Sequence, residues 1–385
     1  MAKNPLFDIE THDQSIWMDF LDRRIIKSGE LEQQIDKWGL QGLTSNPSIF
    51  AKAIGGSDVY DSDIEAGAKA GKSVVEVYES LVFEDIRNAC DIFRPIYDKS
   101  NGEHGYVSIE VSPDLARDTD KTIDEARRYF REIDRPNVMV KIPGTPEGFP
   151  AIEQAISEGI NINITLLFSV ESYEQAAWAY IRGLERRVEN DDRIDNIASV
   201  ASFFLSRIDV KIDDIIEDRL KSEGTENLSE EARLRQLKGK IAIANAKIAY
   251  QKFKEIFGGD RWQALAEKGA TIQRVLWAST STKNPDYSDV MYVNSLVGPH
   301  TVNTMPTSTL EACADHCDVD GDRVEEGVEE AQNLMASLSS PDINIDLDRV
   351  MDELLEEGIE KFVKPYNSVL DALKEKIDRF SPVGV

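Results

Sequence analysis

Short apolar runs alternate with amphipathic helical segments along most of the chain. Eight runs have the length and apolar content of buried strands, and each ends at polar or turn-forming residues. They cover residues 15–19, 42–46, 106–111, 138–142, 160–166, 198–203, 271–278 and 291–297. Because helical segments separate them, the pattern predicts an α/β fold in which a parallel sheet closes into a (β/α)₈ TIM barrel with additional helices.

Helical periodicity supports this alternation. Ile123, Ala126, Phe130 and Ile133 follow one another at spacings of three and four, and charged residues lie between them. Residues 172–188 and 240–257 show the same pattern. The polar, glycine-bearing segment 221–230 is predicted to be an exposed connection.

The chain after residue 311 is acidic and has mostly helical periodicity. We expect residues 1–385 to form a single barrel domain, in which residues 311–385 are a helical tail packed on the barrel. An open, doubly wound sheet would show the same alternation of strands and helices. No glycine-rich dinucleotide motif or phosphate-binding loop follows a predicted strand, so the barrel is favoured.

One predicted strand contains a lysine, Lys141, among Val138, Met139, Val140 and Ile142. An ammonium group is rarely buried without a partner, because water solvates the charge far better than a protein core does. Desolvation favours loss of a lysine proton, which leaves an amine that attacks carbonyl groups. The structural alternative is an edge-strand lysine that limits aggregation, or one whose head reaches solvent.

Polar residues also stand at the ends of the other predicted strands, where barrel enzymes place their chemistry. Individually, each has an ordinary explanation: Asp19 is able to cap a helix, and Asn46 precedes Pro47 as in many turns. A carboxylate within a buried strand, as at Glu110, needs a proton or a partner. As a set they suit imine chemistry, which requires an amine, an acid or base and groups that orient a polyhydroxylated substrate. The set comprises Asp19, Asn46, Glu110, Lys141, Asn163, Thr165, Ser202 and Ser279.

Composition narrows the class of ligand. The 385 residues include 41% hydrophobic residues, enough for a large core, and carry a formal net charge of −27, which argues against nucleic acid as a partner. No run is long enough to span a membrane, and the N-terminus lacks the apolar centre of a signal peptide, so a cytoplasmic protein is expected. Three cysteines fit a reducing compartment. An anionic ligand would need a local cluster of basic groups.

Two segments have a superficial likeness to metal sites. The acidic stretch 318–322 with Glu329 is similar to a calcium loop, but Arg323 occupies the position that requires glycine. Cys313, His316 and Cys317 would bind a metal only if they shared a helical face, and two core cysteines with a surface histidine are favoured. We therefore expect no metal.

Six motifs together resemble the transaldolase family of class I, Schiff-base aldolases. They run in the order of that family and, with Asp19, extend to about residue 309. The motifs are GLTSNPSIF (42–50), VSIEVSP (107–113), NVMVKIPGT (137–145), GININITLLFS (159–169), SVASFFLSRID (199–209) and WASTSTKNP (277–285).

This resemblance implies a role for each matching residue. Lys141 would form the Schiff base with the ketose carbonyl, and Asp19 would take the proton of the C4 hydroxyl as the C3–C4 bond breaks. Glu110 and Thr165 would hold the water that moves protons during imine formation and hydrolysis. No organic or metal cofactor is implied, because the lysine supplies the electron sink.

The resemblance also implies how the substrate is held. Asn46, Asn163 and Ser202 would bind hydroxyl groups of the dihydroxyacetone unit, and Phe204 would pack beside it. Arg207 would bind the terminal phosphate, assisted by a second residue, Ser279.

The phosphate site departs from the family pattern. Many transaldolases have a second arginine two residues after the serine equivalent to Ser279, whereas this chain has Ser281. Lys283 is close in sequence and would supply a charge, although a lysine lacks the two-pronged donor geometry of an arginine.

The implied reaction moves dihydroxyacetone between sedoheptulose 7-phosphate and glyceraldehyde 3-phosphate and yields erythrose 4-phosphate and fructose 6-phosphate, in the non-oxidative pentose phosphate pathway. A homodimer is expected by analogy with other barrel enzymes. A second reading is a fructose 6-phosphate aldolase, although such homologues are shorter and lack the equivalent of Glu110. A third is a non-enzymatic, acidic scaffold in which Lys141 forms a structural ion pair.

Overall fold

Eight parallel strands close into a barrel in chain order in the computed structural model, which describes residues 4–222 and 228–380. Each strand pairs with the next, and β8 pairs with β1 to close the barrel. The strands are β1 Gln14–Asp19, β2 Gly42–Thr44, β3 Tyr106–Glu110, β4 Val138–Pro143, β5 Ile162–Leu167, β6 Ser199–Phe204, β7 Arg274–Ala278 and β8 Thr301–Met305. The predicted (β/α)₈ fold class is confirmed.

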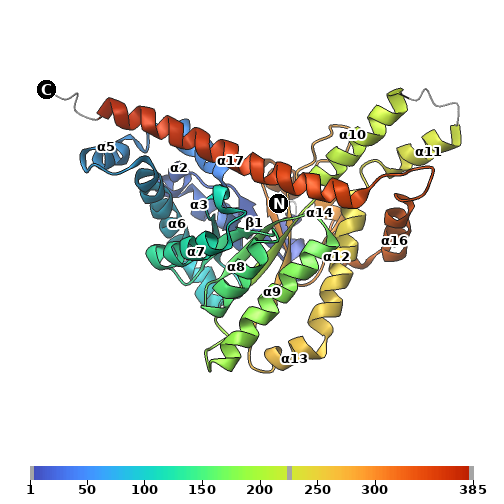
Figure 1. Ribbon diagram of the computed structural model, residues 1–385, viewed down its shortest axis with the longest axis horizontal. Helices are drawn as coiled ribbons and strands as arrows, with labels where there is room; N and C mark the ends of the chain where they lie inside the picture. The colour runs from blue at the N-terminus through green and yellow to red at the C-terminus, as the bar shows by residue number, and fades with distance from the viewer. Residues whose placement is uncertain (1–3, 223–227, 381–385) are drawn as a thin grey trace.

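Helices occupy the connections and surround the barrel (Figure 1). Two short 3₁₀ turns, at Pro113–Leu115 and Arg323–Glu325, supplement them. The helices are α1 Leu6–Glu10, α2 Arg23–Ser28, α3 Glu30–Trp38, α4 Pro47–Gly55, α5 Asp61–Lys69, α6 Val74–Lys99, α7 Thr119–Ile133, α8 Gly148–Ser157, α9 Val170–Glu189, α10 Ser206–Ser222, α11 Leu228–Leu237, α12 Ile241–Gly258, α13 Asp260–Ala266, α14 Met291–Ser295, α15 Thr307–His316, α16 Val328–Ser337 and α17 Leu347–Phe380.

The prediction of the eighth strand was wrong. Residues 291–297 were expected to be a strand, but α14 occupies Met291–Ser295 and the strand is Thr301–Met305. The buried residues Tyr292, Val293 and Leu296 follow a helical spacing within an apolar run too short to distinguish from a strand. In β8, the polar residues Asn303 and Thr304 are both buried, so the segment lacks an apolar signal.

The other predicted elements are present with small shifts of their ends. Seven strands coincide with β1 to β7, and α7, α9 and α12 cover the three segments with helical periodicity. In the expected connection 221–230, residues 223–227 lie outside the described residues. The ends of α10 and α11 occupy the rest of that segment.

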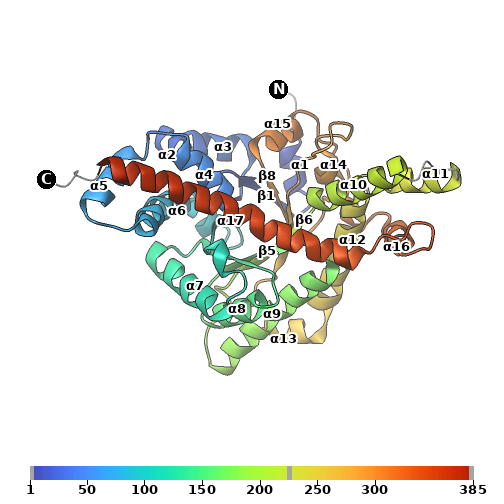
Figure 2. The same cartoon turned by 45° about the horizontal axis from the view of Figure 1, so that its top comes forward.

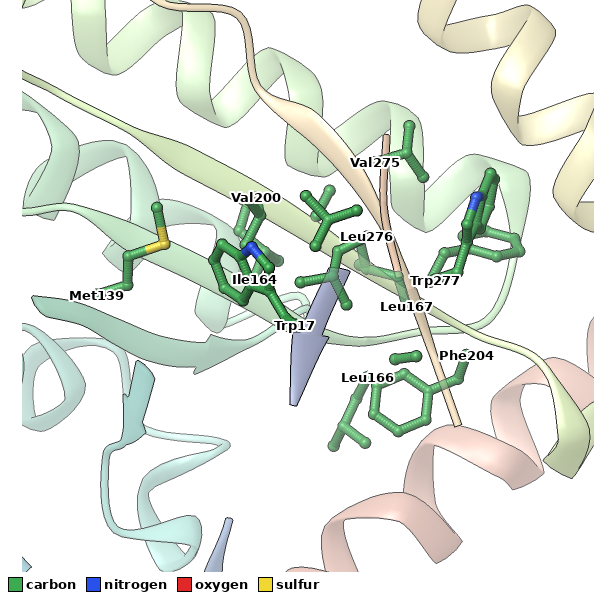
Figure 3. Packing of buried hydrophobic residues seen from close by; sticks show 14 of the residues in the cluster. Trp17, Met139, Ile164, Leu166, Leu167, Val200, Phe204, Val275, Leu276 and Trp277 are labelled. Carbon is green, nitrogen blue, oxygen red and sulfur yellow. The ribbon is translucent and has the colours of Figure 1, made fainter. Parts of the chain in front are cut away.

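Trp17 fills the interior of the barrel below its carboxyl end. The residue is fully buried and lies in register with Gly42 on the neighbouring strand. A Cβ atom on Gly42 would lie 2.4 Å from Trp17 Cε2, so only glycine leaves space for the indole. Trp17 and Leu276 belong to the cluster of buried side chains in and around the barrel (Figure 3). Because side chains alternate along a strand, Asp19 lies on the same face as Trp17, one layer nearer the carboxyl end.

The long helix α17 crosses the barrel. Figures 1 and 2 show it, in red, running over the strands from α5 toward α16. It packs against α4, α5, α6 and α10. Its buried residues recur at spacings of three and four, as expected of an amphipathic helix on a surface; they include Leu354, Gly358, Phe362, Tyr366, Val369 and Leu373. No helix among the described residues is long and apolar enough to cross a membrane.

Candidate active site

Lys141 lies at the centre of three neighbouring strands. In the barrel register it is paired with Glu110 on β3 and with Asn163 on β5, so the three side chains face the interior together. The Lys141 Nζ donates a hydrogen bond of 3.1 Å to the carbonyl oxygen of Ser45 and lies 3.7 Å from Glu110 Oε2. Only 6% of the Lys141 side chain is exposed. The lysine therefore points into the barrel and not into bulk solvent.

Glu110 is a buried carboxyl group beside this amine. Its side chain is 5% exposed, and Oε2 accepts no hydrogen bond from the described residues. Burial raises the pKa of Glu110 to about 7, although the positive charges of Lys141 and Arg207 oppose the shift. A carboxyl group with this pKa exchanges its proton near neutral pH, as an acid or base in catalysis requires.

Asp19 is the second buried carboxyl group. The Thr44 hydroxyl donates a 2.8 Å hydrogen bond to Asp19 Oδ1, and Asp19 and Thr44 are register partners at the ends of β1 and β2. Burial raises the pKa of Asp19, and the nearby charge of Lys141 and the bond from Thr44 partly offset this effect. Asp19 does not cap the following helix; the side chain of Asp22 performs that role for α2.

An irregularity in β5 shapes the middle of the site. The register between β5 and β6 shifts between Ile164 and Leu167, and Leu166 has a φ of +58°. Such a bulge redirects side chains at the end of a strand. The Thr165 hydroxyl is buried and has no hydrogen-bond partner among the described residues. It is therefore free to bind a ligand or a water molecule.

Asn163 and Ser202 form a hydrogen-bonded pair beside Lys141. The Ser202 hydroxyl donates to Asn163 Oδ1 at 2.7 Å, and Asn163 Nδ2 donates to the Ser108 hydroxyl at 3.0 Å. Asn46 has a structural role as well, because its side chain accepts a hydrogen bond from Ile49 N and caps α4. These contacts fix the orientation of the polar groups before any ligand binds.

A cavity of about 290 Å³ connects most of the predicted site residues. The predicted residues that line it are Asp19, Asn46, Lys141, Thr165, Ser202, Phe204, Arg207, Ser279 and Lys283. Glu110 and Asn163 do not line the cavity directly and lie behind Lys141 and Ser202, which they contact. The sequence-based set is thus brought to one place.

One end of the cavity is basic. The Arg207 guanidinium lies 5.1 Å from the ring centre of Phe204 and 5.8 Å from that of Phe362, and its Nη1 has no hydrogen-bond partner among the described residues. Burial lowers the pKa of Arg207, although Glu110 and Asp19 favour its charged form. Lys283 Nζ donates to the Ser281 hydroxyl at 2.5 Å. Partial loss of hydration and the charge of Arg207 lower the pKa of Lys283, although the residue is exposed at the surface.

The serine predicted to assist Arg207 occupies this basic end. Ser279 has a φ of +57°, and its hydroxyl lies 2.8 Å from that of Ser206, the first residue of α10. Arg207, Lys283 and the Ser279 hydroxyl therefore surround a small, positively charged region in an acidic protein. Such a region suits a phosphate group.

A larger groove, about 770 Å³, lies elsewhere on the surface between α8, α9 and α17. Its cations are already paired: Arg182 contacts Glu153 at 2.6 Å, and Arg186 contacts Gln154 at 2.8 Å. The smaller cavity is the better candidate site, because the buried Thr165 hydroxyl and Arg207 Nη1 that line it have no hydrogen-bond partner among the described residues. The pKa values of Asp19, which lines it, and of Glu110, beside Lys141, are also raised.

Sequence reasoning missed several residues of the cavity. Phe362 comes from α17, which lies well beyond the last matching motif at residues 277–285. Its ring centre lies 5.9 Å from Lys141 Nζ. The amphipathic pattern of α17 signalled a buried face without indicating what that face covers. The other missed residues are Thr44, Ser48, Ala278, Ser281, Thr304 and Pro306.

The cysteines do not gather with acidic groups or histidine. Among the described residues, no three His, Cys, Asp or Glu side chains are placed to hold a metal ion. Cys313 and Cys317 are buried, whereas His316 is exposed and contacts Asp289 and Asp315.

A buried lysine close to two buried carboxyl groups, at the carboxyl end of a barrel, suits an enzyme that forms an imine with a carbonyl substrate. The chain belongs to the transaldolase/fructose-6-phosphate aldolase family, whose family model matches residues 16–373. It is 60% identical to a transaldolase from Trichodesmium erythraeum and to "Transaldolase 2" from Nostoc sp., in each case over the full length of both chains. It is 47% identical to a transaldolase from Saccharopolyspora erythraea over 95% of each chain. The resemblance found in the sequence is confirmed.

Proposed function

We propose that this protein is a transaldolase that transfers a dihydroxyacetone unit from sedoheptulose 7-phosphate to glyceraldehyde 3-phosphate. The products are erythrose 4-phosphate and fructose 6-phosphate, and the reaction belongs to the non-oxidative pentose phosphate pathway. The observation that carries the proposal is the buried Lys141 amine 3.7 Å from Glu110 in a cavity with a basic end.

In the proposed mechanism, Lys141 attacks the ketose carbonyl and water is lost to form an iminium. The iminium accepts the electron pair of the C3–C4 bond as that bond breaks, and Asp19 takes the proton of the C4 hydroxyl. The aldose leaves, and a dihydroxyacetone enamine remains bound to Lys141. The enamine then attacks the second aldose, and hydrolysis releases the new ketose and the free amine.

Glu110 and Thr165 are assigned to proton transfer in imine formation and hydrolysis. Support comes from the Glu110 pKa of about 7 and from the unpaired, buried hydroxyl of Thr165. The raised pKa of Asp19 supports its role as the base, because a more basic carboxylate accepts a proton more readily.

Asn46, Asn163 and Ser202 are assigned to the hydroxyl groups of the three-carbon unit, and Phe204 to its apolar surroundings. At the other end of the cavity, Arg207, Ser279 and Lys283 are assigned to the phosphate. The unpaired Nη1 of Arg207 is the strongest support for an anion at this position.

Transfer is favoured over simple aldol cleavage. Two relatives that match 95% or more of the chain are named transaldolases. The chain also has Glu110, and the resemblance implies that the shorter aldolases lack this glutamate. We further propose that the chain acts as one unit, since α17 in the predicted tail contributes Phe362 to the cavity. A cytoplasmic homodimer is the proposed state.

Reductive trapping tests the proposal. The protein is incubated with fructose 6-phosphate and borohydride, and peptide mass spectrometry should find one reduced dihydroxyacetone unit on Lys141. The Lys141→Met variant, which keeps the length of the side chain without the amine, should remain unmodified and inactive. An unmodified Lys141 in an active wild-type enzyme would exclude the Schiff-base assignment.

A further inference from the structure

We propose that Phe362 of α17 is a positioning residue that holds the Arg207 guanidinium for the substrate phosphate. The inference rests on the proposed function, since it concerns the anion end of the same cavity. It adds a residue from the C-terminal helix to a site otherwise built at the strand ends.

Arg207 is held by rings and not by carboxylates. Its guanidinium carbon lies 5.1 Å from the Phe204 ring centre and 5.8 Å from the Phe362 ring centre, distances at which a cation is attracted to an aromatic ring. In the part of the chain that the structure describes, no carboxylate lies within ion-pair distance of Arg207, and its Nη1 remains unpaired. Aromatic contacts restrict the guanidinium without occupying its N–H donors, which stay available for a phosphate.

The position of Phe362 is determined by close contact between α17 and the barrel. Gly358 lies one turn before Phe362 on the same face of the helix. A Cβ atom on Gly358 would lie 3.0 Å from Leu166 and 3.5 Å from Arg207 Nη1. Leu166 and Phe204 lie near each other in the buried cluster (Figure 3), so the helix approaches the barrel at the anion end of the cavity.

Polar contacts hold α17 on both sides of this point. Toward its N-terminus, Lys211 of α10 contacts Glu353 at 2.9 Å and Glu357 at 2.7 Å. Toward its C-terminus, Lys376 contacts Asp61 of α5 at 2.7 Å. With the helix held at both ends, the Phe362 ring centre lies 5.9 Å from Lys141 Nζ and 5.8 Å from the Arg207 guanidinium carbon.

If Phe362 acts through Arg207, its loss should weaken binding of phosphorylated sugars more than binding of sugars without phosphate. A residue that merely stabilised the fold would affect both substrates alike. The comparison therefore uses two acceptors that differ only in the phosphate, glyceraldehyde 3-phosphate and glyceraldehyde.

The test measures kcat and KM of the full-length enzyme for both acceptors. Phe362→Leu keeps an apolar side chain and removes the aromatic face; it should raise the KM for glyceraldehyde 3-phosphate by about 5- to 30-fold, the range expected for a buried cation–ring contact. The KM for glyceraldehyde should change by less than about twofold. Phe362→Tyr retains the face and should restore the KM for the phosphorylated acceptor.

Val369→Ala is the matched control, because Val369 is a buried residue of α17 that does not line the cavity. It should lower the stability of the protein and leave the ratio of the two KM values unchanged. Equal changes for both acceptors in Phe362→Leu, or the same change in Val369→Ala, would overturn the inference. Trapping of the wild-type Lys141 adduct in the same preparation would show that the proposed function holds even in that case.

Discussion

The Lys141 amine and the Glu110 carboxyl group face each other across two neighbouring strands, with Nζ and Oε2 3.7 Å apart. This separation is longer than a direct hydrogen bond, so the two groups interact through their charges. Burial disfavours the charged carboxylate, and the lysine favours it. The pKa of about 7 is the result of this competition, and it makes Glu110 sensitive to pH in the range where the enzyme is expected to work.

The activity of the wild-type enzyme should therefore show an inflection near pH 7 that belongs to Glu110. In Glu110→Gln, the inflection should disappear and kcat should fall by about 10²- to 10⁴-fold, as expected for loss of a proton-transfer group. Profiles of kcat and kcat/KM between pH 5 and pH 9 would be compared, with those limits set about two units either side of the Glu110 pKa. An inflection that persists in Glu110→Gln would assign it to another group.

The same pKa predicts how stability depends on pH. The folded-state pKa of Glu110 is raised above its ordinary value of 4.5, so the native state binds a proton more tightly than the unfolded state does. The stabilisation from this proton is fully present below about pH 4.5 and is lost as the pH rises through about 7. Urea unfolding should show that Glu110→Gln gains stability relative to the wild type between pH 5 and pH 8, a window that contains the Glu110 pKa. A difference independent of pH would contradict the raised pKa.

The barrel and six of the residues that line its cavity were predicted from the sequence pattern, because apolar strands and polar strand ends are local features. Three further lining residues, Phe204, Arg207 and Lys283, came only from the family resemblance. The sequence-based prediction failed for features that depend on contacts between segments far apart in the chain. The eighth strand was missed because Asn303 and Thr304 are polar yet buried. Phe362 was missed because an amphipathic helix reveals which face is buried without revealing its partner. The bulge that redirects Thr165 likewise depends on the pairing of β5 with β6.

Asp19→Asn should separate imine formation from bond cleavage. The amide keeps the size of the side chain and the bond from Thr44, but it is unable to accept the C4 hydroxyl proton. Reductive trapping of the intact ketose on Lys141 should persist, while turnover falls by about 10²- to 10⁴-fold. Mass spectrometry of the trapped adduct and a coupled assay of aldose release would measure the two steps. Normal aldose release by Asp19→Asn would show that Asp19 is not the base.

Lys283→Ala should weaken binding of the substrate phosphate. Lys283 lines the cavity, and the charge of the nearby Arg207 contributes to lowering its pKa. Loss of one charged contact should raise the KM for glyceraldehyde 3-phosphate by about tenfold and change kcat less. Lys283→Arg should keep the KM near that of the wild type. Lys268→Ala removes an exposed lysine before β7 and serves as the control for net charge. An unchanged KM in Lys283→Ala would contradict the prediction and leave Arg207 as the charged phosphate ligand.

Gly42→Ala should destabilise the barrel, because the added methyl group would overlap the Trp17 indole. The added Cβ atom would lie 2.4 Å from the indole, and the neighbouring fully buried strands leave little room for the ring to move. Overpacking of this kind costs about 1–3 kcal/mol, so the urea midpoint should fall. Gly55→Ala is the matched control, because nothing lies within 4 Å of its added Cβ atom at the end of α4. That variant should be neutral or slightly stabilising, since alanine favours helix and restricts the unfolded chain. Equal midpoints for the two variants would mean that the Trp17 ring readily moves away, and that the layer beneath Asp19 is less rigid than the packing implies.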